Sequence, residues 1–234
     1  ERIRAGILYR FADEIIVNSE GARTQLANAI FIDHAKIKIL PNLINYEKIL
    51  SLSKKKIDSK LKNLIANKRL IVSVGRLIRN KDYFTMLRAI KDLNRENIIL
   101  LIMGEGKQYD IINKEIIKLK LQEKVELMGY VENPYNIMKI ADVFLLTSIF
   151  EGMPNVLIEA LSLKVPIVSS NCNSGPRELI NNGENGFLVP VGDYIGFARA
   201  IEKQLSNPII GDNLTIIHNH SEKNVLEILN EIIK

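Results

Sequence analysis

Short runs of consecutive apolar residues alternate with segments of helical periodicity along most of this chain, and this alternation constrains the fold more than any other feature. Because the runs are continuous, we expect strands that are buried on both faces. Strand–helix alternation of this kind produces right-handed crossovers. The sequence therefore predicts an α/β fold, a doubly wound parallel sheet with helices on both faces. The expected strands span residues 14–18, 36–40, 69–74, 98–103, 125–129, 143–147, 166–170 and 186–189. The expected helices span residues 21–29, 83–93, 107–119, 135–140, 154–163, 176–181, 194–205 and 221–233.

A polar, lysine-rich stretch at residues 51–68 interrupts this pattern. We interpret residues 1–43 as the last βα unit of an N-terminal domain that is mostly missing, and residues 44–68 as a linker with a first helix. Residues 69–209 then form a complete doubly wound domain, and residues 210–234 carry a tail helix. The alternative is one continuous sheet with a long polar connection. The first residue is Glu1 and not methionine, which suggests a fragment of a longer protein.

The charge balance argues against a nucleic-acid partner. The chain has 32 Lys and Arg against 27 Asp and Glu, a formal net charge of +5, and both signs are mixed along it. A nucleic-acid-binding protein would normally gather the excess into one stripe, and only Lys54-Lys55-Lys56 forms a run. No apolar stretch approaches the roughly 18–20 residues of a membrane span. With a single cysteine, Cys172, and no visible signal peptide, we expect a reducing, cytoplasmic compartment.

The placement of histidine and cysteine predicts no metal site. His34, His218 and His220 have no carboxylate or cysteine cluster at metal-ligand spacing, and we expect the His218–His220 pair on the surface. Cys172 has no evident histidine partner, so we expect a small buried residue there.

In an open parallel sheet the ligand lies beyond the carboxyl ends of the strands, so the loops that follow the strands are candidate sites. The expected strand at 69–74 leads into Gly75-Arg76, with Lys81 shortly after. Glycine lets the backbone approach a ligand, arginine forks two donors onto a phosphate and lysine adds a point charge. The alternative is that Arg76 and Lys81 are solvated residues at a helix start.

The next strand ends in Gly104-Glu105-Gly106. This pair of glycines lacks the third glycine of a dinucleotide fingerprint, so a nicotinamide-dinucleotide site is only weakly supported. A tight turn is the simpler interpretation of Gly104 and Gly106 alone.

The segment from Thr147 to Leu161 carries the strongest signal. A strand ends at Ser148, and Pro154 fits the first position of a helix. The amides that follow would be unpaired first-turn donors, ready for an anion. Glu151 and Glu159 bracket this helix start, and two carboxylates beside a phosphate site suit a ligand with hydroxyls on both sides, a nucleotide-sugar. The alternative is that Glu151 is an ordinary loop residue and that Glu159 lies on a solvated helix face. The unpaired amides belong to Asn155, Val156 and Leu157.

A series of motifs resembles one known family from about Ala12 to the end of the chain. In order, they are VGRLIRNKDY, GEGK, VELMGYV, ADVFLLTSIFEGMPNVLIEALSLKVPIVSSN and SGPRELINNGENGFLVPVGD. Together they resemble the C-terminal, donor-binding half of a retaining family 4 glycosyltransferase. That family has the GT-B fold and builds bacterial capsule, O-antigen and lipopolysaccharide glycans. The resemblance implies a Rossmann-like C-terminal domain, and Glu151 and Glu159 are its most specific element.

The resemblance also implies roles for the matching residues. Arg76, Lys81 and Glu151 would be catalytic: the two cations would hold the donor diphosphate, and Glu151 would contact hydroxyls of the transferred sugar. Glu159 would bind the ribose hydroxyls. The family needs no metal or other cofactor, because basic side chains and helix amides stabilise the leaving diphosphate where charge develops. The other residues expected in the donor site are Gly75, Gly104, Gly106, Tyr130, Val131, Ser148, Pro154, Asn155, Val156 and Leu157, with Tyr130 and Val131 bordering the base.

One departure from the family concerns the acceptor. The family binds a glycan or lipid-linked acceptor through an N-terminal domain, of which only the last unit matches here. We therefore expect an inactive isolated chain that holds the donor, and a full-length enzyme peripheral at the inner membrane. Uridine is the expected base, with guanosine as the runner-up. A smaller departure is Met153-Pro154-Asn155 where many relatives carry Phe-Gly.

Two alternatives to a transferase remain at this point. A sugar-nucleotide epimerase of the same fold would also hold a diphosphate and a ribose. A non-catalytic nucleotide-sugar-binding subunit would pair with a separate acceptor-binding chain.

Overall fold

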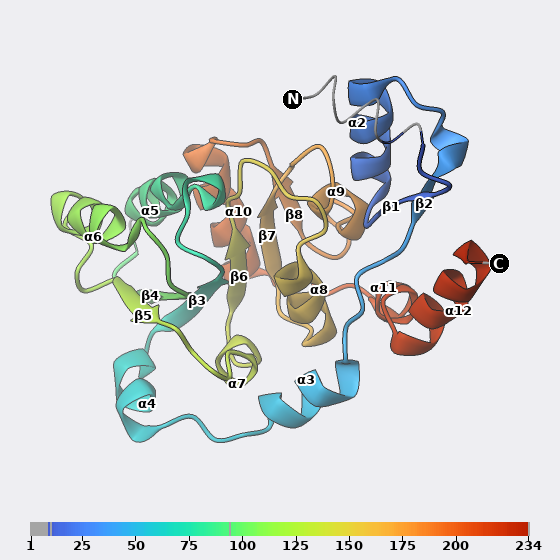
Figure 1. Ribbon diagram of the computed structural model, residues 1–234. Helices are drawn as coiled ribbons and strands as arrows, with labels where there is room; N and C mark the ends of the chain where they lie inside the picture. The colour runs from blue at the N-terminus through green and yellow to red at the C-terminus, as the bar shows by residue number, and fades with distance from the viewer. Residues whose placement is uncertain (1–8, 10, 94, 234) are drawn as a thin grey trace.

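The computed structural model describes residues 9, 11–93 and 95–233 (Figure 1). Its elements follow the predicted alternation closely. The strands are β1 (Ile15–Val17), β2 (Ile37–Ile39), β3 (Arg69–Val74), β4 (Ile98–Met103), β5 (Val125–Gly129), β6 (Val143–Leu146), β7 (Ile167–Ser170) and β8 (Phe187–Val189). The α-helices are α2 (Glu20–Ile30), α3 (Tyr46–Ser53), α4 (Ser59–Ile65), α5 (Tyr83–Asp92), α6 (Tyr109–Lys118), α7 (Tyr135–Met138), α8 (Asn155–Ser162), α9 (Pro176–Leu179), α10 (Tyr194–Ser206), α11 (Leu214–Asn219) and α12 (Glu222–Ile232).

A six-stranded parallel sheet forms the centre of the molecule, which confirms the predicted doubly wound fold. Its strand order is β5-β4-β3-β6-β7-β8. The chain builds outward from β3 to β5, and then returns to place β6 on the other side of β3. Val72 of β3 accordingly pairs with Leu101 of β4 on one side and with Phe144 of β6 on the other. The direction of winding therefore reverses between β3 and β6, and this boundary is the switch point of the sheet.

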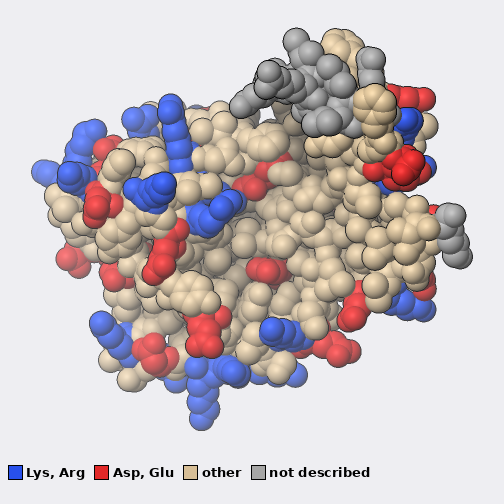
Figure 2. Space-filling model, viewed as in Figure 1, with Lys and Arg blue, Asp and Glu red and all other residues tan. Residues whose placement is uncertain are grey.

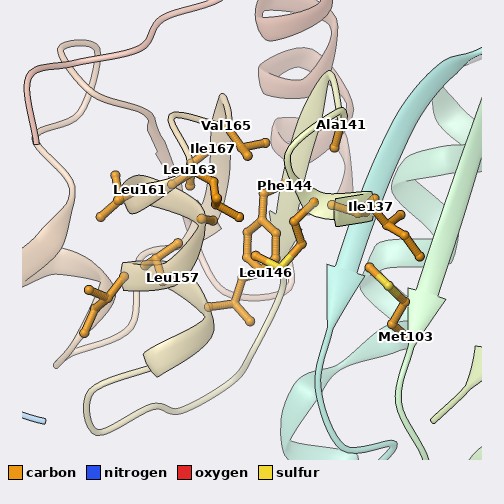
Figure 3. Packing of buried hydrophobic residues seen from close by; sticks show 14 of the residues in the cluster. Met103, Ile137, Ala141, Phe144, Leu146, Leu157, Leu161, Leu163, Val165 and Ile167 are labelled. Carbon is orange, nitrogen blue, oxygen red and sulfur yellow. The ribbon is translucent and has the colours of Figure 1, made fainter. Parts of the chain in front are cut away.

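The sheet separates two apolar layers, which explains why its strands are continuously apolar. In β3, Leu70 and Val72 enter one layer and Ile71 enters the other. Helices α5, α6 and α10 cover the face that buries Ile71, and α3, α4, α7, α8 and α9 cover the opposite face. Figure 3 shows Phe144 and Leu146 of β6 facing Leu157 of α8 in this second layer. Helix α8 is thereby held rigidly against the strands next to the switch point.

The N-terminal segment forms a separate small unit. Strands β1 and β2 pair in parallel as a two-stranded sheet, and α2 packs on them around Ile15, Ala27 and Ile37. Ser19 caps α2 by accepting a hydrogen bond from the amide of Ala22 at 3.1 Å. Neither strand belongs to the six-stranded sheet. The unit's origin in a larger domain stays a prediction.

The linker and the tail each contain one helix more than we predicted. Linker residues 44–68 hold α3 and α4, because Asn45 and Asp58 cap them through the amides of Lys48 and Leu61, at 2.8 and 2.7 Å. Each of the two helices has one buried residue: Ile49 in α3 and Leu61 in α4. In the tail, α11 precedes the predicted helix and has no buried residue of its own, so its sequence carries little apolar periodicity.

Candidate active site

The loops after β3 and β4 interlock through their backbones. The amide of Leu77 donates to Glu105 O at 2.8 Å, and the amide of Gly75 donates to Met103 O at 3.0 Å. A Cβ on Gly104 would lie 2.0 Å from Gly75 O, and Gly104 has a φ of +147°. Only glycine satisfies both conditions, so the loops after β3 and β4 can touch because of this residue.

These two loops and the one after β5 enclose a pocket of about 400 Å³. It is lined by five of the residues that the sequence predicted for the donor site, including both residues expected to border the base. Tyr130 is 73% exposed and forms part of the wall. Gly106 does not line the pocket, and a Cβ there would collide with Leu77 O at 2.3 Å, so its observed contact is with the loop after β3. The predicted residues that do line it are Gly75, Arg76, Gly104, Tyr130 and Val131.

Lys81 and Glu151 meet beside this pocket. The Lys81 Nζ lies 2.5 Å from Glu151 Oε1, and the two side chains are only 15% and 11% exposed. The hydroxyl of Ser148 donates to the same carboxylate oxygen at 2.5 Å. Ser148 is fully buried, so its hydroxyl orients Glu151 rather than facing solvent. Hydrogen bonds from Lys81 and Ser148 thus hold the Glu151 carboxylate in place near the carboxyl end of β6.

Hydrogen bonds between the loops after β3 and β6 bring Lys81 to Glu151. The hydroxyl of Thr147 donates to the carbonyls of Lys81 and Asp82, both at 3.0 Å. The amide of Ile149 donates to Asn80 O at 2.8 Å. The two loops leave adjacent strands, β3 and β6, at the switch point, and these hydrogen bonds hold them together.

Helix α8 begins one residue later than we predicted. Pro154 is its N-cap and not its first helical residue. The amide of Leu157 donates to Pro154 O at 3.0 Å, so it is not a free donor, and its side chain is fully buried. The amides of Asn155 and Val156 have no hydrogen-bond partner within the described part of the chain. Two of the three predicted anion donors therefore remain available.

Glu159 lies one turn further along α8 and is paired with Tyr135 of α7. The Tyr135 hydroxyl donates to Glu159 Oε1 at 3.3 Å. Burial raises the pKa of Glu159, and the hydrogen bond from Tyr135 opposes that rise. Burial, and then the Glu159 charge, raise the pKa of Tyr135 to about 12, so the hydroxyl stays protonated and donates. Glu159 is therefore a half-buried acceptor and not a solvated helix face.

Sequence reasoning missed several residues that support the site. Tyr83 is almost fully buried and its hydroxyl donates to Gly75 O at 3.1 Å, which holds the loop that lines the pocket. Burial, followed by the charge of Glu151, raises the pKa of this tyrosine. Its position just after VGRLIRNKD was the available signal, but a tyrosine at a helix start has no distinctive chemistry. Tyr135 and Asn42 were also missed.

Two predictions about single residues met different outcomes. Cys172 is buried as predicted, with its thiol donating to Ser148 O at 3.1 Å and its pKa raised mainly by burial. His220 was predicted on the surface and is instead 5% exposed, with Nδ1 lying 2.8 Å from Asn42 O. Burial lowers the pKa of His220, while the contact with Asn42 O opposes that change. The prediction failed because α12 folds back onto the linker.

Charged side chains of both signs are mixed on the face that Figure 2 draws, and they do not form one continuous basic stripe there. Lysine and arginine side chains gather over the region of α5 and α6 but alternate there with acidic ones, and the middle of this face is mostly uncharged. The described residues contain no group of three or more His, Cys, Asp or Glu that could hold a metal ion. Within the same ranges, no helix has the length and apolarity needed to cross a bilayer.

Solved glycosyltransferase structures share this arrangement of sheet and helices. The structure of Anabaena HepE in complex with UDP and glucose matches 99% of this chain and 65% of its own, at a TM-score of 0.84 and 23% identity. The structure of a glycosyltransferase from Rickettsia africae matches 98% of this chain and 66% of its own, with a TM-score of 0.85 and 21% identity. The fold is therefore that of the Rossmann-like domain of GT-B glycosyltransferases.

The chain belongs to the family of glycosyl transferases group 1, whose sequence profile matches residues 54–223. One relative is an N-acetylgalactosaminyltransferase of Campylobacter jejuni that is named for a diphospho-undecaprenol acceptor. It is 34% identical over 201 residues, which are 86% of this chain and 53% of that protein. An uncharacterized glycosyltransferase of Methanocaldococcus jannaschii is 32% identical over 174 residues, 74% of this chain and 43% of its own. The chain thus spans about half the length of the curated relatives it matches.

Proposed function

We propose that the whole protein is a retaining hexosyltransferase that moves a sugar from a UDP-sugar to a glycan or lipid-linked acceptor, and that this chain holds the donor. The carrying observation is the Lys81–Glu151 pair beside the free amides of α8, all at the switch point of the sheet. A cation, two helix amides and a fixed carboxylate in one place suit a diphosphate joined to a sugar.

Each part of the donor would meet a different element. Arg76 and Lys81 would contact the diphosphate together with the amides of Asn155 and Val156, and so stabilise the charge that develops on the leaving group. Because this chemistry uses fixed donors, the proposal includes no metal ion or other cofactor. The base would occupy the pocket beside Tyr130, and Glu159 would accept from the ribose hydroxyls.

The proposed role of Glu151 follows from how it is held. Lys81 and Ser148 both use Oε1, which leaves Oε2 to accept hydrogen bonds from a sugar hydroxyl. A hexose fixed in this way keeps its anomeric carbon at a constant position relative to an acceptor. Retention of configuration is proposed from the resemblance of the EGMPNVLIEA segment to retaining enzymes.

The nature of the donor and acceptor is proposed from the relatives. HepE is described in complex with UDP and glucose, which supports a UDP-sugar. The Campylobacter relative and a galactosyltransferase of Escherichia coli are both named for diphosphoundecaprenol-linked acceptors. A capsular polysaccharide glycosyltransferase of Staphylococcus aureus is a third relative, 29% identical over 215 residues. We accordingly propose a surface-polysaccharide enzyme that works at the cytoplasmic side of the membrane as a peripheral protein.

Calorimetry with two ligands tests the proposal. Losing a hydrogen bond to a charged group costs about 1.5–3 kcal/mol, roughly a factor of 10 to 150 in affinity. Glu159→Ala should therefore weaken the binding of both UDP and a UDP-hexose. Glu151→Ala should leave UDP almost unchanged and weaken only the UDP-hexose. Wild-type binding of both ligands by both variants would reject the proposal.

A matched activity measurement separates a transferase from other uses of the same site. The full-length protein should release UDP only when an acceptor is added, and the present chain should bind UDP without transferring sugar. Interconversion of the donor sugar while it stays attached to UDP would indicate an epimerase instead, and UDP release without an acceptor would mean hydrolysis of the donor by water.

A further inference from the structure

Asn42 lies just after β2, at the end of the N-terminal segment, yet its side chain contacts residues 147–154, the loop before α8 that we call the donor loop. Its Nδ2 donates to Met153 O at 3.1 Å and to Asn155 Oδ1 at 2.5 Å. Its Oδ1 accepts from Asn18 Nδ2 at 3.2 Å. The side-chain amide of Asn42 therefore donates to the start of α8 and accepts from the N-terminal unit.

The backbone of Asn42 is held from a third direction. His220 is buried in the turn between α11 and α12, where it caps the end of α11, and its Nδ1 lies 2.8 Å from Asn42 O. Two residues later, the amide of Ile44 donates to His220 O at 2.9 Å. Asn42 is therefore held by contacts with the N-terminal unit, the donor loop and the turn before α12.

The partners of Asn42 lie where the proposed chemistry is most sensitive to position. Met153 and Asn155 flank Pro154, the N-cap of α8, and the loop before it contains no helix or strand. The free amides that would meet the diphosphate belong to Asn155 and Val156. Gly152 lets Asn18 come close, because a Cβ there would lie 3.3 Å from Asn18 Oδ1.

We propose that Asn42 is a positioning residue of the donor site, which aims the first amides of α8 by tying the donor loop to the N-terminal unit. The inference rests on the proposed function for the identity of the ligand. Oriented donors lose much of their effect when they are displaced by about 1 Å, so a loosened α8 start would bind a diphosphate less well.

Substitution by aspartate is the sharpest probe, because it keeps the size of the side chain and replaces the Nδ2 donor by a negatively charged oxygen. In Asn42→Asp a carboxylate would face Met153 O and Asn155 Oδ1, which are both acceptors, while it could still accept from Asn18. We expect UDP to bind Asn42→Asp about tenfold or more weakly by calorimetry. We also expect Asn42→Ala and Asn155→Ala together to weaken UDP binding less than the sum of the two single changes, since they remove one shared contact.

Asn45 provides the matched control: it lies three residues further along the chain and caps α3, and within the described residues no hydrogen bond joins it to the donor loop. Asn45→Ala should lower the urea midpoint and leave the UDP affinity unchanged. Equal loss of affinity in Asn45→Ala and Asn42→Asp would overturn the inference in favour of a general folding defect. Wild-type UDP affinity in Asn42→Asp would overturn it directly, while failure of the wild-type chain to bind UDP at all would instead reject the proposed function.

Discussion

Lys81 Nζ lies 2.5 Å from Glu151 Oε1 across the switch point of the sheet, although 70 residues separate the two in sequence. Both side chains are more than four-fifths buried. The cation proposed for the phosphate and the carboxylate proposed for the sugar thus pair with each other. The pair preorganises both groups, so a bound donor would find Glu151 already oriented.

The burial of this pair predicts a large effect on stability. Removing one partner of a buried ion pair leaves the other charge uncompensated, which costs about 3 kcal/mol or more. Lys81→Met should therefore lower the free energy of unfolding by about 3 kcal/mol, and Glu151→Gln in the same chain should restore part of the loss. Urea unfolding of the single and double variants measures both changes.

An exposed pair on α6 supplies the control. Lys118 Nζ lies 3.2 Å from Glu115 Oε2, but the lysine is 71% exposed. Lys118→Met should change the free energy of unfolding by less than about 0.5 kcal/mol. Equal effects at Lys81 and Lys118 would contradict the idea that the Lys81–Glu151 pair is shielded from solvent.

The raised pKa of Glu159 predicts a pH-dependent contribution to stability. Because burial raises this pKa, the folded state binds more protons than the unfolded state between the ordinary carboxyl pKa and the raised one. The contribution of Glu159 to the free energy of unfolding therefore falls as pH rises through that window. Glu159→Gln cannot ionise, so its stability relative to the wild type should increase from acidic to neutral pH. Unfolding curves at several pH values check this, and a constant difference would count against it.

The Tyr135 hydroxyl should be measurable through its effect on Glu159. Its hydrogen bond opposes the rise caused by burial, so Tyr135→Phe should raise the pKa of Glu159 further. Carbon-13 NMR titration of the Glu159 carboxyl follows this directly. Tyr109→Phe on the exposed side of α6 should leave the titration unchanged. A Glu159 titration that Tyr135→Phe does not move would mean that the hydroxyl contributes nothing in solution.

Gly104 should be far less tolerant of a side chain than another glycine with a positive φ. Gly104→Ala combines a backbone strain with a Cβ placed 2.0 Å from Gly75 O, and should cost about 3 kcal/mol or more. Gly183 has a φ of +86° and open space around it, so Gly183→Ala should cost only about 1–2 kcal/mol. Thermal or urea unfolding compares the two. The expected difference vanishes if the loops after β3 and β4 can separate without cost.

Local patterns of this sequence were sufficient for the sheet. Strands β3 to β8 lie within a residue or two of the predicted runs, because burial on both faces favours short, mainly apolar runs. Placing Arg76, Gly104 and Ser148 at one edge followed from the rule that parallel strands end on the same side. The helices α3 and α11 were missed because short capped helices with few buried residues leave little periodicity.

The contacts that complete the site were decided only by tertiary packing. Pairing of Lys81 with Glu151 depends on the adjacency of β3 and β6, which strand order determines and sequence spacing does not. Asn42 reaches Asn155 over 113 residues, and it does so only because the linker crosses the start of α8. For hydrogen bonds of this kind, the residues next to each partner in sequence do not indicate which distant residue it contacts. Sequence therefore specified which chemical groups stand at the carboxyl edge of the sheet, and the packing of loops and helices determined which of them meet.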